Sequence, residues 1–117
     1  MADPTAILDW EQLDMVAFGY TPDFVEIYVE FLKQTPELLA QLREAEGAGD
    51  ITQVAELAHK IKGSALNFGF VGVSSPMEEL EVAAKGAKTL EGARESVQQA
   101  GENFEAARAE VAAARNI

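Results

Sequence analysis

The sequence predicts an all-α protein, an up-and-down four-helix bundle with a short additional N-terminal helix. Alanine, leucine, glutamate and glutamine dominate the composition, and these residue types favour helices. No alternating run of apolar and polar residues is long enough for a sheet, whereas apolar residues recur every three or four positions. Short connections between such amphipathic helices indicate antiparallel neighbours, which is the arrangement of a bundle.

The composition indicates one soluble domain over residues 1–117. Hydrophobic residues make up 48% and charged residues 25%, which is the balance of a folded protein and not of a disordered acidic chain. The net charge of −11 argues against nucleic acid and anionic lipid as partners. The absence of cysteine excludes disulfides and sulfur-ligated metals. Residues 1–4 lack signal-peptide features and no run suits a membrane span, so we expect a cytoplasmic protein. A monomer is expected because no large unexplained apolar face is evident.

Two helices are expected in the first half of the chain. Asp9 is placed to cap the first, which ends at Gly19 and should cover the bundle as a lid. The second starts at Thr21 with Pro22 in its first turn, and Pro36 should kink or restart it near residue 35. Its predicted core face consists of Phe24, Ile27, Tyr28, Phe31, Leu32, Leu38 and Leu39.

Three helices are expected in the second half. Asp50 should cap the third, which runs to about Phe68. Ser75 should cap the fourth, which runs over about residues 76–85 until Gly86 breaks it. The last helix has an apolar stripe made by Leu90, Ala93, Val97, Ala100, Phe104, Ala107, Val111 and Ala114.

The third helix contains the only histidine of the chain. Its core stripe is expected to comprise Val54, Leu57, Ala58, Ile61, Ala65 and Phe68. His59 lies off this stripe and should face outward, on the flank that also holds Thr52, Ala55, Glu56, Lys62, Gly63 and Leu66. Gly63 costs about 1 kcal/mol inside a helix relative to alanine but bares the backbone beside the imidazole. Lys62 can bring its ammonium toward an anion on the ring, so this arrangement suits a transient phosphohistidine.

The segment around this histidine resembles the signature of histidine-containing phosphotransfer (HPt) domains. That signature has lysine at +3, glycine at +4, a small residue at +5, asparagine at +8 and glycine at +10 from the histidine. The matching residues here are His59, Lys62, Gly63, Ser64, Asn67 and Gly69. The pairs Gly49-Asp50 and Leu80-Glu81 also resemble family positions. Three residues depart from the pattern and should affect the docking surface or the helix geometry: Pro36, Lys60 and Phe70.

The resemblance implies a phosphorelay intermediate and not an enzyme that uses ATP. His59 would accept a phosphoryl group from a receiver-domain aspartyl phosphate and pass it to another receiver aspartate, with Lys62 stabilising the group. The implied partners are response-regulator receiver domains and the receiver domains of hybrid histidine kinases. No cofactor or metal of its own is expected, since the Mg²⁺ would sit on the receiver. The expected docking residues are Val25, Val29, Leu32, Ala55, Glu56 and Leu66.

Other interpretations remain open. Ser64 could bond back to a helix carbonyl, and Asn67 could be a polar residue near a helix end. The whole domain could be a non-catalytic helical adaptor that docks receiver or kinase domains without carrying phosphate. A small histidine-dependent phosphohydrolase is a further alternative, but no second acid or base is placed by the motif.

Overall fold

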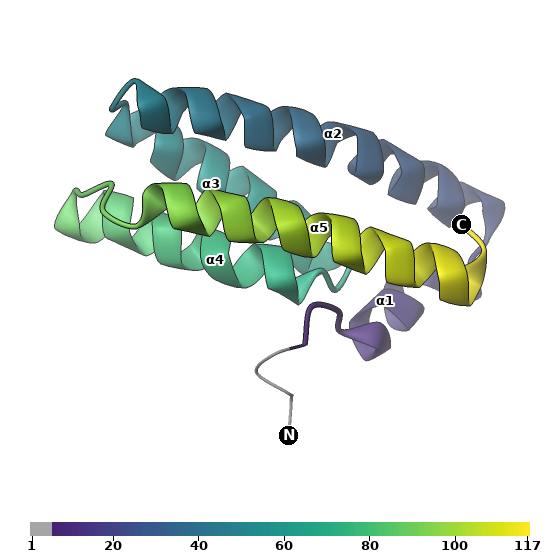
Figure 1. Cartoon of the computed structure of the whole chain (residues 1–117). Helices are drawn as coiled ribbons and strands as arrows, with labels where there is room; N and C mark the ends of the chain where they lie inside the picture. Colours follow the sequence, from purple (N-terminus) through teal and green to yellow (C-terminus); the bar gives the residue numbers. More distant parts are fainter. Residues whose placement is uncertain (1–5) are drawn as a thin grey trace.

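Four long helices form an up-and-down bundle, and a short helix lies against one end (Figure 1). The computed structural model describes residues 6–117, so the expectation about residues 1–4 lies outside the described part. Successive long helices run in opposite directions, which confirms the predicted fold class. The helices are α1 (Trp10–Ala17), α2 (Pro22–Gly47), α3 (Ile51–Asn67), α4 (Val71–Val82) with its π-helical extension η1 (Ala83–Ala87), and α5 (Ala93–Arg115).

Local capping signals place the starts of the first three helices. The side chain of Asp9 accepts a hydrogen bond from the backbone N–H of Gln12, and that of Asp50 accepts one from Gln53, both at 3.1 Å. Thr21 caps α2 in the same way. These bonds satisfy backbone donors that have no partner inside the helix. All three predicted starts are therefore confirmed.

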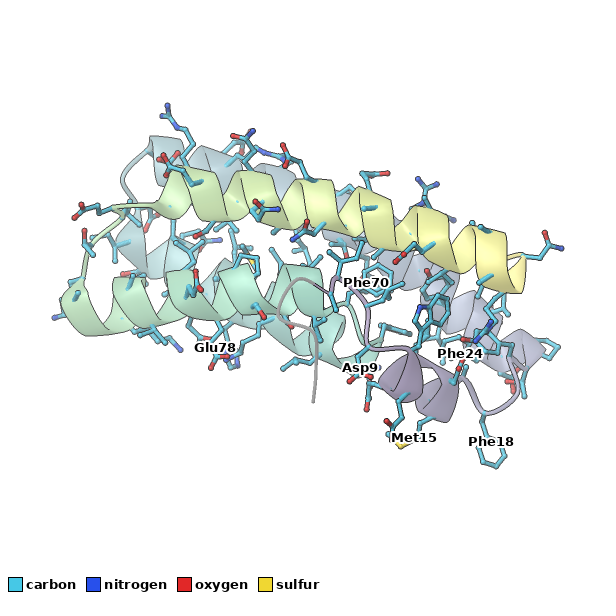
Figure 2. All side chains as sticks on the ribbon, turned by 60° about the horizontal axis from the view of Figure 1, so that its bottom comes forward. Asp9, Met15, Phe18, Phe24, Phe70 and Glu78 are labelled. Carbon is cyan, nitrogen blue, oxygen red and sulfur yellow. The ribbon has the colours of Figure 1, made fainter. Side chains whose placement is uncertain are left out.

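An aromatic cluster fills the core between α2, α3 and α5. The rings of Phe31 and Phe68 stack at 4.5 Å between centroids, and the ring of Phe70 lies edge-on to Phe31 at 5.0 Å. Figure 2 shows Phe70 pointing into the bundle, so its expected effect on the docking surface is wrong. The apolar pattern predicts Ile27 in the core, but it is exposed because α2 turns this position away from its neighbours.

The fourth helix differs from its prediction at both ends. It starts at Val71, five residues before the expected Pro76, and Pro76 lies inside it. A proline lacks the N–H that would bond the carbonyl four residues earlier, here that of Gly72. The side-chain amide of Asn103 on α5 donates to this carbonyl at 2.9 Å and so replaces the missing partner. Gly86 does not break the helix, since η1 continues to Ala87.

The other internal proline leaves α2 as a single helix. Pro36 lies within Pro22–Gly47, so of the two predicted outcomes, a kink or a restart, the restart does not occur. Thr35 is buried beside it, and its hydroxyl donates to the carbonyl of Phe31 at 2.9 Å.

No helix within residues 6–117 is long and apolar enough to cross a membrane.

Contacts with the end of α3 and with the end of α5 hold α1 on the bundle. The backbone N–H of Asp9 donates to the carbonyl of Gly69 at 2.7 Å, just beyond the end of α3. At the end of α5, the Arg115 guanidinium pairs with Asp14 at 3.0 Å and lies 4.6 Å from the centre of the Trp10 ring. These contacts place α1 across the end of the bundle, as the lid prediction required (Figure 1).

Candidate functional site

His59 stands on the flank of α3 that faces α4. Its side chain is 64% exposed, so one side of the ring is open to solvent. Gly63 lies one turn further along, and a Cβ atom built on it would meet no other atom within 4 Å. The surface beside the imidazole is therefore open, as predicted from the spacing of these two residues.

A single carboxylate on α4 contacts three cationic or ionisable side chains. The Oε2 atom of Glu81 lies 2.7 Å from Nδ1 of His59 and 2.7 Å from Nζ of Lys85. Its Oε1 atom lies 2.7 Å from Nζ of Lys62. The Glu81 side chain is buried, whereas His59 and Lys85 are more than half exposed. Glu81 thus holds the imidazole through Nδ1 on its buried side, and it links α3 to the end of α4.

The charge state of Glu81 determines which nitrogen of His59 is free. The ammonium groups of Lys62 and then Lys85 lower the pKa of Glu81 to about 2, although burial acts in the opposite direction. An ionised carboxylate can only accept hydrogen bonds, so Nδ1 of His59 must carry the hydrogen. In the neutral ring, Nε2 then has a free electron pair. The same contact with Glu81 raises the pKa of Lys62.

Lys62 is placed close to the imidazole but does not face solvent freely. Its side chain is only 21% exposed, and its ammonium is paired with Glu81. Ser64 is half-buried and Asn67 is exposed, and their roles at the site stay predictions. The backbone carbonyl of Asn67 does accept a hydrogen bond from Gln12 of α1 at 3.2 Å.

Gly69 has a structural role in this fold. Its φ of +72° lies in the left-handed region, and an added Cβ would collide with the carbonyl oxygen of Asp9. The residue is buried and lies away from the imidazole, at the junction of α3 with α1. Gly69 lets α1 approach the end of α3, and its supporting role at the site stays a prediction.

The predicted docking residues on α3 divide into two groups. Glu56 and Leu66 are exposed on the same flank as His59, and Leu66 is 50% exposed. Ala55 is buried, so its expected place on the outer surface is wrong. It is at the floor of a groove of about 490 Å³ between α3 and η1. This groove is lined by Ile51, Thr52, Ala55, Glu56, Ala84, Lys85 and Lys88.

The predicted docking residues on α2 lie on a different edge of the bundle. Val25, Val29 and Leu32 share one stripe of α2 with Pro36, because they precede it at helical spacing. Pro36 lines a groove against α5. His59 instead faces α4 through Glu81. The structure therefore does not bring the α2 stripe together with His59.

Glu81 and Lys85 are the site residues that the sequence prediction missed. The sequence places Glu81 in a pair with Leu80 that resembles family positions, but it indicates no role for the carboxylate. A signal was present, since Met77, Leu80, Glu81 and Ala84 follow the spacing of a core stripe. A carboxylate on such a stripe requires a cationic partner.

Within residues 6–117, no three His, Asp or Glu side chains are arranged to hold a metal ion.

The comparison with protein families agrees with the motif. The Hpt domain family model matches residues 26–116, which is most of the chain. No curated protein and no solved structure gives a significant match. Hpt domains act in phosphotransfer within two-component signalling as phosphocarriers, and they interact with receiver domains and histidine kinases. The matched range includes α3 and Glu81, and the resemblance predicted from the sequence is confirmed. This chain belongs to the Hpt domain family.

Proposed function

We propose that this protein is a phosphorelay intermediate whose phosphoacceptor is His59. It takes a phosphoryl group from the aspartyl phosphate of one receiver domain and passes it to the aspartate of another. Receiver domains of response regulators and of hybrid histidine kinases are the proposed partners. The observation that supports this best is the 2.7 Å contact between Nδ1 of His59 and Glu81 beneath an exposed ring.

The transfer step needs no proton to leave the attacking atom. With Nδ1–H bonded to Glu81, the electron pair of Nε2 attacks phosphorus in line with the aspartyl oxygen. The Nε2–P bond forms, the P–O bond to the aspartyl group breaks, and the aspartate leaves as a carboxylate. The reverse sequence discharges the histidine to a second receiver. Glu81 also stabilises the positive charge that the ring gains as the Nε2–P bond forms.

The remaining groups of the transfer are divided between the two proteins. Lys62 is proposed to help neutralise the transferring oxygens from this side. The Mg²⁺ ion belongs to the receiver domain, and no cofactor is assigned to this chain. Gly63 leaves room for the receiver loop that carries the aspartate, while Glu56 and Leu66 form the surrounding docking face.

A non-catalytic adaptor is the second candidate, because an exposed helix face can bind a partner without chemistry. The hydrogen bond from His59 to Glu81 favours the relay, since docking alone does not require a fixed imidazole tautomer. The two candidates differ in one observable. The relay forms acid-labile, alkali-stable phosphate on the protein, whereas an adaptor binds a phosphorylated receiver and gains no phosphate.

The test is phosphotransfer from a phosphorylated receiver domain to the wild-type protein and to His59→Gln. The wild-type protein should acquire phosphate as soon as it is mixed with the phosphorylated receiver. His59→Gln should acquire none, and its circular dichroism spectrum should remain helical. The exposed position of His59 makes a folding defect in this variant unexpected. Undiminished labelling of His59→Gln would refute the assignment.

A further inference from the structure

Three side chains share Glu81, but they differ in their freedom to move. Lys62 is 21% exposed, whereas Lys85 is 57% exposed and extends from η1 over the surface. Lys85 contacts Oε2, the same oxygen that accepts from Nδ1 of His59. Because both distances are 2.7 Å, Nδ1 and Nζ of Lys85 are separated by no more than twice that length. Lys85 is thus an exposed cation close to the imidazole.

The charges around Glu81 do not balance. One carboxylate contacts two ammonium groups, so Glu81, Lys62 and Lys85 together carry a net positive charge even when the imidazole is neutral. Glu78 acts on Lys62 as a further negative charge, but it is not in ion-pair contact with Lys85. This local excess occurs in a chain whose overall charge is −11. A phosphoryl group on Nε2 would bring about two negative charges to the same surface. One of the two lysines can then leave Glu81 without leaving that carboxylate unpaired.

We propose that Lys85 is a second phosphoryl-binding cation of the site, which turns from Glu81 to the phosphoryl group on His59 and prolongs the phosphohistidine. Lys85 is better suited to this movement than Lys62, because its stem is already exposed and little burial is lost. The proposal rests on the proposed function, since it requires a phosphoryl group on His59.

A purely structural role for Lys85 has a different consequence. As an i,i+4 partner of Glu81, it would contribute about 0.3–0.5 kcal/mol to helix stability. Its loss would then change the unfolding midpoint slightly and leave the chemistry of the phosphohistidine unchanged. The lifetime of the phosphorylated protein therefore separates the two roles.

The experiment uses the full chain loaded with phosphoramidate, a small donor that needs no receiver surface. In loading, the P–N bond of phosphoramidate breaks, the Nε2–P bond forms and ammonia leaves. In hydrolysis, a water oxygen bonds to phosphorus, Nε2 keeps the electron pair and inorganic phosphate leaves. After the donor is removed, phosphate release is followed for wild type, Lys85→Met, Lys85→Arg and Lys88→Met, with ³¹P spectra of each loaded protein.

We expect Lys85→Met to shorten the lifetime of the phosphohistidine about three- to fivefold, because this is the size of effect that one partly exposed charge contact produces. Lys85→Arg should restore it, and the ³¹P resonance should move in Lys85→Met. Lys88→Met is the matched control, because it removes an exposed lysine of the same groove that has no ion pair to Glu81. This control should keep the wild-type lifetime.

Two results would overturn the proposal while leaving the proposed function intact: equal lifetimes of wild type and Lys85→Met, or equal shortening in Lys85→Met and Lys88→Met. The second result would indicate a general electrostatic effect of the surface lysines and not a contact between Lys85 and the phosphoryl group. Failure of wild type to accept phosphate on His59 from phosphoramidate and from any receiver would instead contradict both the function and this inference.

Discussion

Glu81 illustrates how one residue can set the chemistry of another. It is buried, and its ion pairs come from α3 on one side and from η1 on the other. Because its carboxylate accepts from Nδ1, the hydrogen of His59 is held inward and Nε2 is left outward. The positions of His59, Lys62 and Gly63 could be predicted from spacing along one helix. The pairing with Glu81 could not, because it depends on how α4 packs against α3.

The ion pairs of Glu81 predict an acid-dependent loss of stability. The pKa of Glu81 is held at about 2 in the folded protein, below its ordinary value of 4.5. Its contribution is therefore fully present above about pH 4.5 and is lost as the pH falls toward 2. Glu81→Gln should lower the free energy of unfolding at pH 7 by on the order of 2 kcal/mol, and this difference should close in acid.

Urea unfolding of wild type and Glu81→Gln from pH 7 to pH 2.5, below the ordinary pKa of 4.5, measures this difference. Glu79→Gln is the control, because Glu79 is exposed on the same helix and is within ion-pair distance of no lysine in the described part of the chain. It should have little effect at any pH. A gap between wild type and Glu81→Gln that persists unchanged in acid would contradict the assigned ion pairs.

At the scale of the element, helix starts could be predicted where the signal is local. The caps Asp9, Thr21 and Asp50 each bond a backbone N–H three residues ahead, so sequence alone contains the information. The start of α4 could not be predicted in this way. Its internal proline is tolerated because Asn103, 31 residues from Gly72, supplies the missing donor. That compensation exists only after α5 has packed against α4.

The junction of α1 with α3 gives a prediction for Gly69. Gly69 and Gly49 both have left-handed φ values, +72° and +70°, but only Gly69 faces another backbone. Gly49→Ala should cost only the strain of the left-handed conformation, about 1–2 kcal/mol. Gly69→Ala should cost at least about 1 kcal/mol more, because the new Cβ displaces Asp9 and hence α1.

Chemical unfolding of the two variants measures their stabilities, and Trp10 reports on α1 directly. Trp10 is the only tryptophan of the chain and lies partly buried against the core. Its emission should move to longer wavelength in Gly69→Ala and stay unchanged in Gly49→Ala. Equal destabilisation of the two variants would show that contact with Asp9 does not matter.

At the scale of the whole molecule, charge and shape single out the α3–α4 edge. Residues 51–88, which hold α3, α4 and η1, contain four lysines against four glutamates, so the net charge of −11 belongs to the rest of the chain. An anionic partner is therefore repelled less at this edge than elsewhere on the molecule. The antiparallel order of helices could be predicted from short connections. The sequence could not predict which edges of the bundle adjoin His59. Each amphipathic helix has two flanks, and its sequence does not show which neighbour lies on which flank.

This asymmetry predicts that receiver docking depends on one edge of the bundle. Leu66 and Val29 are exposed aliphatic side chains, with exposed fractions of 50% and 37%. Only Leu66 lies on the flank of α3 that carries His59. Leu66→Glu should raise the KM for a phosphorylated receiver about tenfold, because it places a charge in a desolvated contact. Val29→Glu makes the same charge change near α5 and should leave the KM unchanged.

Loading with phosphoramidate separates docking from chemistry in these variants. Both should accept phosphate from this small donor at the wild-type rate, since His59, Glu81 and their hydrogen bond are untouched. A defect of Leu66→Glu with both donors would point to a disturbed α3 and not to lost docking. If Val29→Glu raised the KM as much as Leu66→Glu, the α2 stripe would belong to the docking surface after all. The receiver would then have to contact opposite edges of the bundle, which requires a partner that wraps around it.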